Sequence, residues 1–169
     1  DYMARHGVRR ARPAELIPGT VRVITARLDY FPAGARDPAA LLADRARAYV
    51  SRYALGRDYH KVMRQRLARL AARIADEVGD FGHRVFSDSA PVMEVALAAR
   101  AGIGWRGKHT LLLTRQGSWF FLGEIYTDLP LPPTPPVGAH CGTCTACLDA
   151  CPTGAIVAPY ELDARLCIS

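Results

Sequence analysis

Cysteine is absent from the first 140 positions of this 169-residue chain, and all five cysteines lie between positions 141 and 167. This distribution excludes a disulfide scaffold spread over the fold and is typical of a metal-binding module in a reducing compartment. The chain also lacks an apolar run approaching the ~20 residues of a membrane span, and it opens without a signal peptide. We therefore expect a cytoplasmic protein that has no membrane partner.

Acidic residues are fewer than basic ones, because 16 Asp and Glu stand against 22 Lys and Arg, giving a formal net charge of +6. The excess suits a nucleic-acid or phosphate-rich partner, although an arginine-rich composition from a GC-rich genome explains it equally well. Hydrophobic residues make up 50% of the chain, which is enough for a folded core. The chain begins with Asp and stops soon after its fifth cysteine, so we expect a fragment that lacks both ends of a longer protein.

Four of the cysteines form a C-x2-C-x2-C-x3-C-P run at Cys141, Cys144, Cys147 and Cys151. This spacing is that of bacterial ferredoxins, in which three thiolates bind one iron–sulfur cluster and the fourth binds a second cluster. Zinc sites favour separated cysteine pairs or mixed Cys and His ligands. The run therefore predicts electron transfer. Two clusters use eight thiolates, so we expect three further ligands downstream of the five present.

The segment from 58 to 78 gives the clearest helix prediction, because apolar residues recur at helical spacing before Gly79. Pro91 predicts the first turn of a helix running to Arg100. The other patterns predict strands over residues 21–30, 84–86, 111–114 and 119–126, the last two joined as a hairpin. The predicted apolar stripe of the helix consists of Val62, Leu67, Leu70, Ile74 and Val78.

A proline-rich segment over residues 131–137 predicts a stiff, extended linker. We expect an α+β domain before it, over residues 1–130, and a ferredoxin-like iron–sulfur module after it, over residues 138–169. Because an electron-carrying module is fused to the larger domain, we expect that domain to reduce or oxidise a substrate.

Several motifs together resemble the epoxyqueuosine reductase family. They are Y-A-L-G-R-D-Y-H-K at 53–61, D-S-A-P-V-M-E at 88–94, A-G-I-G-W-R-G-K-H-T at 101–110, F-F-L-G-E at 120–124, the cysteine run, and D-A-R-L-C-I-S at 163–169. The resemblance implies a cobalamin-dependent enzyme of tRNA modification that reduces the epoxide of epoxyqueuosine to queuosine. It also implies a nitroreductase-like or reductive-dehalogenase-like cobalamin-binding domain over residues 1–130, followed by a partial module for two 4Fe–4S clusters.

The resemblance assigns Asp88 the role of proton donor. From the residues alone, an Asp shortly before a helix is more simply read as its N-cap. The resemblance also implies that cobalamin contacts come from the loop and helix motifs, namely from Arg5, Tyr59, His60, Lys61, Asp88, Trp105, Gly107, Lys108 and His109. It implies a first cluster on Cys141, Cys144 and Cys147, and a second on Cys151 and Cys167.

The resemblance implies tRNA carrying epoxyqueuosine as the partner, with an external electron donor of unknown identity, and we expect a monomer. Three other functions stay open. A simple electron-transfer protein would bind iron and sulfide without cobalamin. A reductive dehalogenase-like enzyme would act on a small organohalide, and such enzymes often carry a twin-arginine signal, which is not visible here. A fragment that binds nucleic acid by charge alone would show steep salt dependence and bind no cofactor.

Overall fold

A computed structural model describes residues 5–88 and 90–168 of the chain. The chain divides into two compact units, one formed by Asp1–Val92 and Trp119–Pro130 and the other by Met93–Ser118 and Leu131–Ser169. The chain therefore leaves the first unit after Val92 and returns to it at Trp119. Among the described helices, none combines the length and apolar character that crossing a bilayer requires.

A three-stranded antiparallel sheet forms the centre of the first unit. Its strands are β1 (Arg22–Asp29), β2 (His83–Phe86) and β5 (Phe120–Thr127), in the order β1-β5-β2. The central strand β5 is the most deeply buried, and its Ile125 side chain is completely inaccessible to solvent. Strands at 21–30 and 84–86 were predicted at almost these bounds, and the predicted mixture of helices and strands is confirmed.

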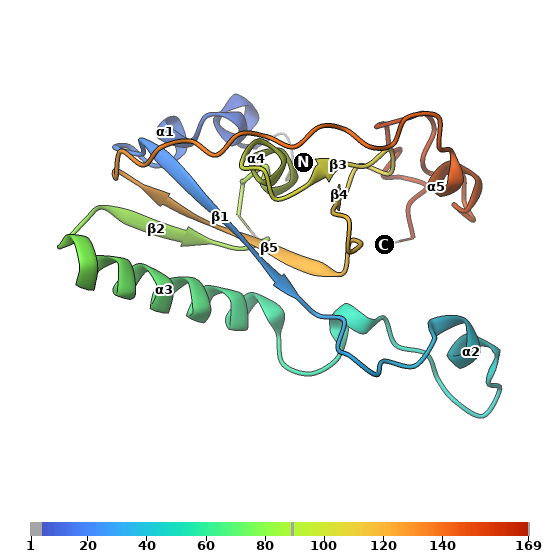
Figure 1. Cartoon of the computed structure of the whole chain (residues 1–169). Helices are drawn as coiled ribbons and strands as arrows, with labels where there is room; N and C mark the ends of the chain where they lie inside the picture. The colour runs from blue at the N-terminus through green and yellow to red at the C-terminus, as the bar shows by residue number, and fades with distance from the viewer. Residues whose placement is uncertain (1–4, 89, 169) are drawn as a thin grey trace. The chain divides into compact units, whose positions relative to one another are not determined.

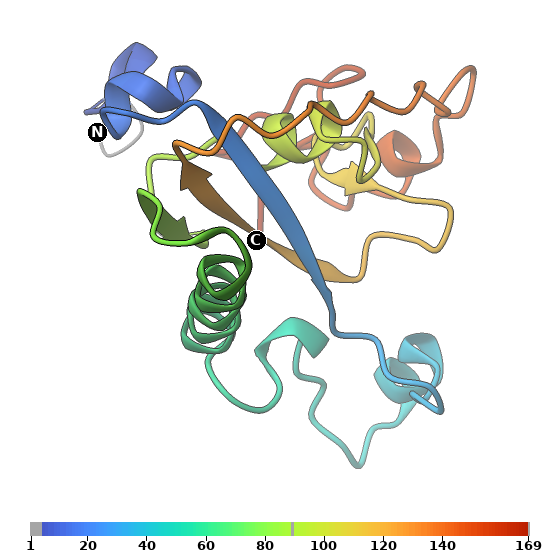
Figure 2. The same ribbon diagram turned by 60° about the vertical axis from the view of Figure 1, so that its left-hand side comes forward.

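Helix α3 (Tyr59–Val78) runs along one face of this sheet (Figures 1 and 2). It begins where the Asp58 carboxylate accepts a hydrogen bond from the His60 backbone N–H at 3.0 Å, and it ends at Gly79, whose φ of 85° suits glycine. Both ends agree with the sequence prediction.

The buried stripe of α3 differs from the predicted one. Met63, Leu67 and Ala71 form a core cluster with Ile125 of β5, whereas Leu70 and Val78 are exposed. The helix approaches the sheet closely at Gly123, where an added Cβ would lie 2.8 Å from Leu67 Cδ1. The hydropathy pattern did not indicate which side of the helix is buried, because the buried side includes the small Ala71 and the flexible Met63, and Met63 lies opposite Gly123.

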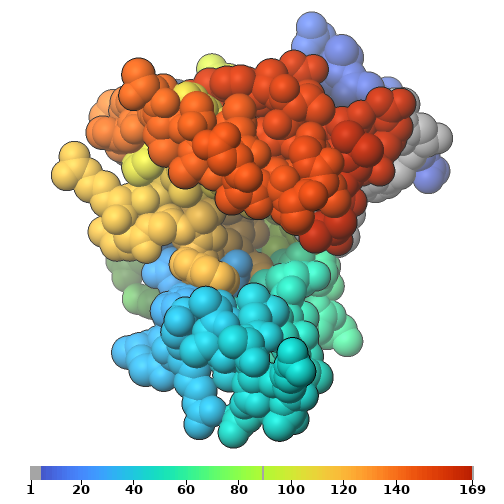
Figure 3. Space-filling model, turned by 90° about the vertical axis from the view of Figure 1, so that its right-hand side faces the viewer, coloured from blue at the N-terminus to red at the C-terminus, as the bar shows by residue number. Residues whose placement is uncertain are grey.

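The remaining elements of the first unit are short. They are the 3₁₀ helices η1 (Gly7–Ala11) and η2 (Arg52–Ala54) and the helices α1 (Pro13–Leu16) and α2 (Pro38–Ala43). The segment from 31 to 57, which contains α2 and η2, lies at the surface drawn in cyan shades at the bottom of Figure 3.

The second unit contains helix α4 (Glu94–Arg100), the two-residue strands β3 (Trp105–Arg106) and β4 (Leu112–Leu113), and helix α5 (Ala146–Asp149). Strand β4 pairs with β3 and not with β5, so the predicted pairing of the two strands over 111–126 is wrong. The turn predicted between them is present, because Thr114 and Gly117 form an antiparallel bridge. Helix α4 begins at Glu94, three residues after the predicted Pro91 start, because residues 90–92 form tight turns: the Val92 N–H donates to the Ala90 carbonyl at 2.8 Å.

Candidate active site and iron–sulfur module

Asp88 lies in a turn just after β2, in an unusual backbone conformation. Its φ of 53° falls in the left-handed region, which Asp and Asn tolerate better than most residues. The preceding Ser87 is buried and donates a hydrogen bond from its hydroxyl to the Leu122 carbonyl at 3.2 Å, which ties the turn to β5. The Asp88 side chain is 54% exposed and is therefore accessible to a substrate.

The first turn of α3 supplies the hydrogen-bond donors to this carboxylate. The Tyr59 hydroxyl donates to Asp88 Oδ2, and His60 Nε2 lies 3.0 Å from the same oxygen. The Tyr59 ring is itself fixed, because it stacks on Phe121 of β5 with centroids 4.0 Å apart and an interplanar angle of 3°. Asp88 thus does not cap α4, whose N-cap residue is Met93, so the simpler interpretation of Asp88 as a helix cap is wrong.

His60 connects Asp88 to a second carboxylate. His60 Nδ1 lies 2.9 Å from Asp58 Oδ1, so the imidazole stands between two acids. The ring donates through both nitrogens only as an imidazolium, and when it is neutral one carboxyl group must supply the proton instead. The hydrogen bond from His60 is the main reason that the pKa of Asp58 is lowered. Asp58, His60 and Asp88 therefore form a chain that can hold and pass one proton.

The structure brings Tyr59, His60 and Asp88 together, as their joint assignment to one site requires. Lys61 is exposed in the first turn of α3, and Arg5 is exposed just before η1. Asp58 was not predicted as a site residue. The sequence feature that could have indicated Asp58 is its position two residues before His60, because the carboxylate of an N-cap residue can reach the His60 side chain at that spacing.

The predicted residues of the second unit contact other parts of that unit. The space that a Gly107 Cβ would occupy is filled by His109 Cε1 at 2.7 Å and Leu113 Cδ1 at 2.8 Å. His109 Nδ1 accepts a hydrogen bond from the Leu111 N–H at 3.1 Å, and partial burial lowers its pKa. The Trp105 ring packs edge-on against His140, and its Nε1 is buried without a hydrogen-bond partner among the described residues.

Lys108 contacts the cysteine run. Its side chain is 9% exposed, and its Nζ donates to the carbonyls of Gly142 and Cys144, each at 2.8 Å. The prediction that Lys108 contacts cobalamin stays a prediction, and the structure gives its ammonium two partners that the sequence did not suggest.

All five cysteines are free thiols, and Cys144 is the exposed one. The Cys144 N–H donates to the Cys141 carbonyl at 2.9 Å, which forms a turn between the first two members of the run. Backbone N–H groups of Ile156 and Thr153 lower the pKa of Cys151 to about 7, so its thiolate is readily formed. These features fit iron–sulfur ligands, although the described side chains include no cluster of three or more metal-ligating groups.

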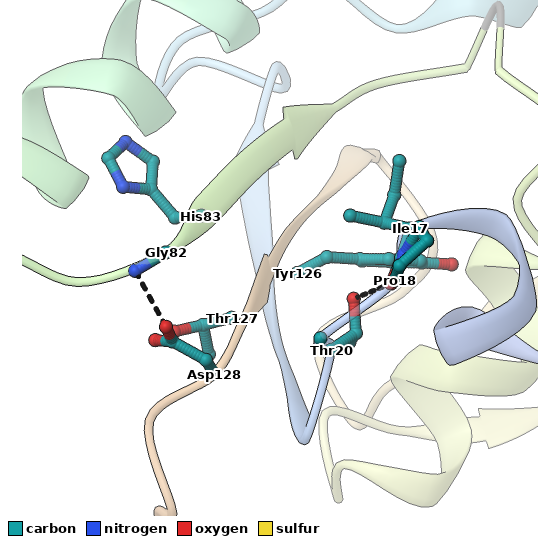
Figure 4. A pocket seen from close by; sticks show the side chains of 9 residues that line it. Ile17, Pro18, Thr20, Gly82, His83, Tyr126, Thr127 and Asp128 are labelled. Atoms are coloured by element: carbon teal, nitrogen blue, oxygen red, sulfur yellow. Dashed lines mark hydrogen bonds between the residues drawn. The ribbon is translucent and has the colours of Figure 1, made fainter.

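Two hollows lie elsewhere in the first unit. Figure 4 shows one of about 110 Å³, where the Asp128 carboxylate accepts from the Gly82 N–H at 2.9 Å and the Thr20 hydroxyl donates to the Ile17 carbonyl at 2.7 Å. The other, of about 340 Å³, is lined by residues between Arg36 and Leu55, among them Arg36, Arg47 and Arg52. Neither is lined by a predicted site residue.

The outer surface of α3 carries a group of cations that we call the basic face of α3. All five are exposed, and none takes part in an ion pair with another described residue; they are Lys61, Arg64, Arg66, Arg69 and Arg73. No acidic residue lies in the first turn of the helix to complement its dipole. The Asp58 N-cap carboxylate, which lies just before the first turn, complements this end of the helix instead.

Two family models match the chain. Residues 10–89 match "Epoxyqueuosine reductase QueG, DUF1730", and residues 140–169 match "4Fe-4S double cluster binding domain". The epoxyqueuosine reductase of Burkholderia pseudomallei is 62% identical over 195 residues, which cover 100% of this chain and 47% of that protein. The resemblance to epoxyqueuosine reductases is confirmed.

Solved epoxyqueuosine reductases have the same fold. The enzyme from Bacillus subtilis, solved with a catalytic aspartate loop swung out of the active site, gives a TM-score of 0.79 at 34% identity over 93% of this chain and 41% of that one. An epoxyqueuosine reductase solved with an epoxyqueuosine-modified tRNA-Tyr stem loop gives a TM-score of 0.78 at 34% identity, over 93% and 42% of the two chains. The chain spans about half the length of the curated epoxyqueuosine reductases that it matches.

Proposed function

We propose that this chain carries the reductase activity that converts epoxyqueuosine in tRNA to queuosine, the last step of queuosine biosynthesis. The observation on which the proposal rests is the Asp88 carboxyl group, which is exposed, held by Tyr59 and His60, and connected through His60 to Asp58. The sequence identity to epoxyqueuosine reductases and the tRNA stem loop bound by one of them support the substrate.

Removing an epoxide oxygen consumes two electrons and two protons, forms a carbon–carbon double bond and releases water. The oxygen is a poor leaving group until it is protonated, so the reaction needs a positioned acid. Asp88 delivers a proton to this oxygen, and His60 replaces it while Asp58 stabilises the charged imidazole. Tyr59 fixes the position of the carboxyl group by its hydroxyl, and the ring of Tyr59 is held in turn by Phe121.

We further propose that the larger part of the chain is a nitroreductase-like, reductive-dehalogenase-like cobalamin-binding domain. Bound cobalamin would supply the low-valent cobalt that reduces the substrate. The buried, unpaired Trp105 Nε1–H fits the amide carbonyls at the edge of a corrin ring. The other candidate contacts are Arg5, Tyr59, His60, Lys61, Asp88, Gly107, Lys108 and His109.

Iron–sulfur clusters would supply the electrons. We propose that Cys141, Cys144 and Cys147 bind a first 4Fe–4S cluster, and that Cys151 and Cys167 bind a second. The match to a double-cluster binding domain over residues 140–169 supports this proposal. An external one-electron donor, a cytoplasmic location and a monomeric state complete it.

The test is Asp88→Asn in the intact protein, purified without oxygen. Asn tolerates the left-handed backbone and keeps the side-chain shape, but it does not donate a carboxyl proton. We expect cobalamin and iron to stay bound, as judged by visible spectra, while turnover measured by mass analysis of modified tRNA falls about 10²–10⁴-fold. Asp76→Asn, an exposed position on α3, is the matched control.

Turnover of Asp88→Asn equal to that of the control would remove Asp88 as the acid. A protein that holds iron but never binds cobalamin would instead indicate a simple electron-transfer function.

A further inference from the structure

Lys108 is the one basic side chain that is buried among the described residues. Its backbone carbonyl accepts a hydrogen bond from the Tyr160 N–H at 2.8 Å, and its Nζ donates to Gly142 and Cys144. Both ends of the residue are thereby attached to the segment after the proline-rich stretch. A lysine at the surface would be free to move, whereas this one is fixed within the second unit.

The two carbonyls that bind the ammonium lie inside the cysteine run. Gly142 follows the first cysteine, and Cys144 is the second, so the ammonium holds the loop that presents Cys141, Cys144 and Cys147. Gly142 has a φ of 43°, which shows that the loop takes a conformation suited to glycine at this contact. Lys108 therefore helps to determine how the first three thiols of the run are presented.

The charge of Lys108 has no carboxylate partner among the described residues, whose ion pairs do not include it. Burying an ammonium costs free energy unless negative charge compensates it. Two carbonyl dipoles compensate it only in part. Thiolates bound to iron and sulfide carry net negative charge, so a cluster in this loop is the anion that the buried ammonium lacks.

We propose that Lys108 is both the clamp and the counter-charge of the first iron–sulfur cluster, and that it raises the reduction potential of that cluster. The inference rests on the proposed cluster site. Reduction adds one electron, taken from an external one-electron donor, and neither forms nor breaks a bond nor moves a proton. A 4Fe–4S cluster on four thiolates changes its net charge from −2 to −3 in this step, and a nearby fixed cation favours the more negative form.

The test compares Lys108→Met and Lys108→Gln with Arg115→Met in the intact protein, reconstituted without oxygen. Arg115 is an exposed cation of the same unit, so its variant controls for the loss of one charge. Met removes both the charge and the hydrogen bonds, whereas Gln removes the charge but still donates. Iron and sulfide content, electron paramagnetic resonance of the reduced protein, and potentiometric titration with dithionite are measured.

We expect Lys108→Gln to keep the iron content of the control. At a fixed potential, the ratio of reduced to oxidised protein should fall about tenfold for one cluster and stay unchanged for the other. That change corresponds to about 59 mV for a one-electron couple. Loss of one cluster from Lys108→Met, with the melting temperature of the metal-free protein unchanged, would also support the clamp.

Full iron content with control potentials in both variants would overturn the proposal. So would loss of both clusters from both variants together with a lowered melting temperature of the metal-free protein, since Lys108 would then serve only the fold. If the control binds clusters but does not reduce epoxyqueuosine, the proposed function fails and the Lys108 inference still stands on the potentials. A control protein that binds no iron refutes both.

Discussion

Replacing Gly123 by Ala tests how closely α3 lies on the sheet. A Cβ at this position of β5 would lie 2.8 Å from Leu67 Cδ1, 3.0 Å from Met63 Cγ and 3.0 Å from the Phe86 carbonyl oxygen. Carbon atoms in proteins pack at about 3.5–4.0 Å. The added methyl group therefore forces the helix or its side chains to move.

The cost follows from this crowding. Overpacking of a core by one methyl group destabilises a protein by about 1–3 kcal/mol, and Leu67→Ala alone should cost about 2–5 kcal/mol by leaving a cavity. In the double variant the Leu67 clash disappears, whereas the contacts with Met63 and Phe86 remain. We expect the double variant to lose less than the sum of the single variants, by at least about 1 kcal/mol.

Thermal melting followed by circular dichroism measures these effects, because 1 kcal/mol shifts the melting temperature of a chain of this size by about 2–4 °C. Gly138→Ala is the matched control, since nothing lies within 4 Å of the Cβ it adds and its backbone is not left-handed. Two single effects that add to within about 0.5 kcal/mol would refute the predicted close approach at Gly123.

Two further predictions concern charge. Burial lowers the pKa of His109, so the unfolded chain binds a proton at a higher pH than the folded chain does. The contribution of His109 to stability should be complete above its unfolded pKa of about 6.5 and should be lost as the pH falls through its folded pKa. His109→Gln should flatten that loss when the melting temperature is measured as a function of pH. On the basic face of α3, replacing Arg66, Arg69 and Arg73 together by Gln should weaken the proposed binding of tRNA. The slope of the logarithm of the binding constant against the logarithm of the salt concentration should become shallower by about 2, at ~0.7 per phosphate contact. Arg115→Gln should leave this slope unchanged, and an unchanged slope in the triple variant would mean that this face does not bind the RNA backbone.

The sequence predicted elements whose signals are local. Helix α3 was predicted to within a residue because its cap at Asp58 and its terminal Gly79 adjoin it, and β1 and β2 were predicted from their β-branched and aromatic residues. The partners of strands were not predictable in the same way. The residues between β4 and β5 look like a hairpin turn, but these two strands do not pair with each other: β4 pairs with β3, whereas β5 pairs with β1 and β2.

The residues of the candidate site also differ in whether a local sequence signal could identify them. The cysteine run and Asp88 could be found because each belongs to a contiguous motif. The contact of His60 with Asp88 joins residues 28 positions apart, and that of Lys108 with Gly142 joins residues 34 apart. Neither the periodicity nor the composition of the chain encodes which distant carbonyl or carboxylate a side chain will meet, so these two contacts required the three-dimensional structure.

The order of the strands has a consequence for how the protein is made on the ribosome. In the described part of the chain, both outer strands, β1 and β2, pair only with β5, which is synthesised about a hundred residues after β1. A nascent chain that has not yet reached Phe120 thus has two strands whose backbone edges await the same partner. Helix α3, which covers them, is synthesised before β5. The sheet therefore forms late and through contacts between residues far apart in the sequence, which slows folding. Until then the apolar face of α3 is exposed, which favours its early protection by a chaperone.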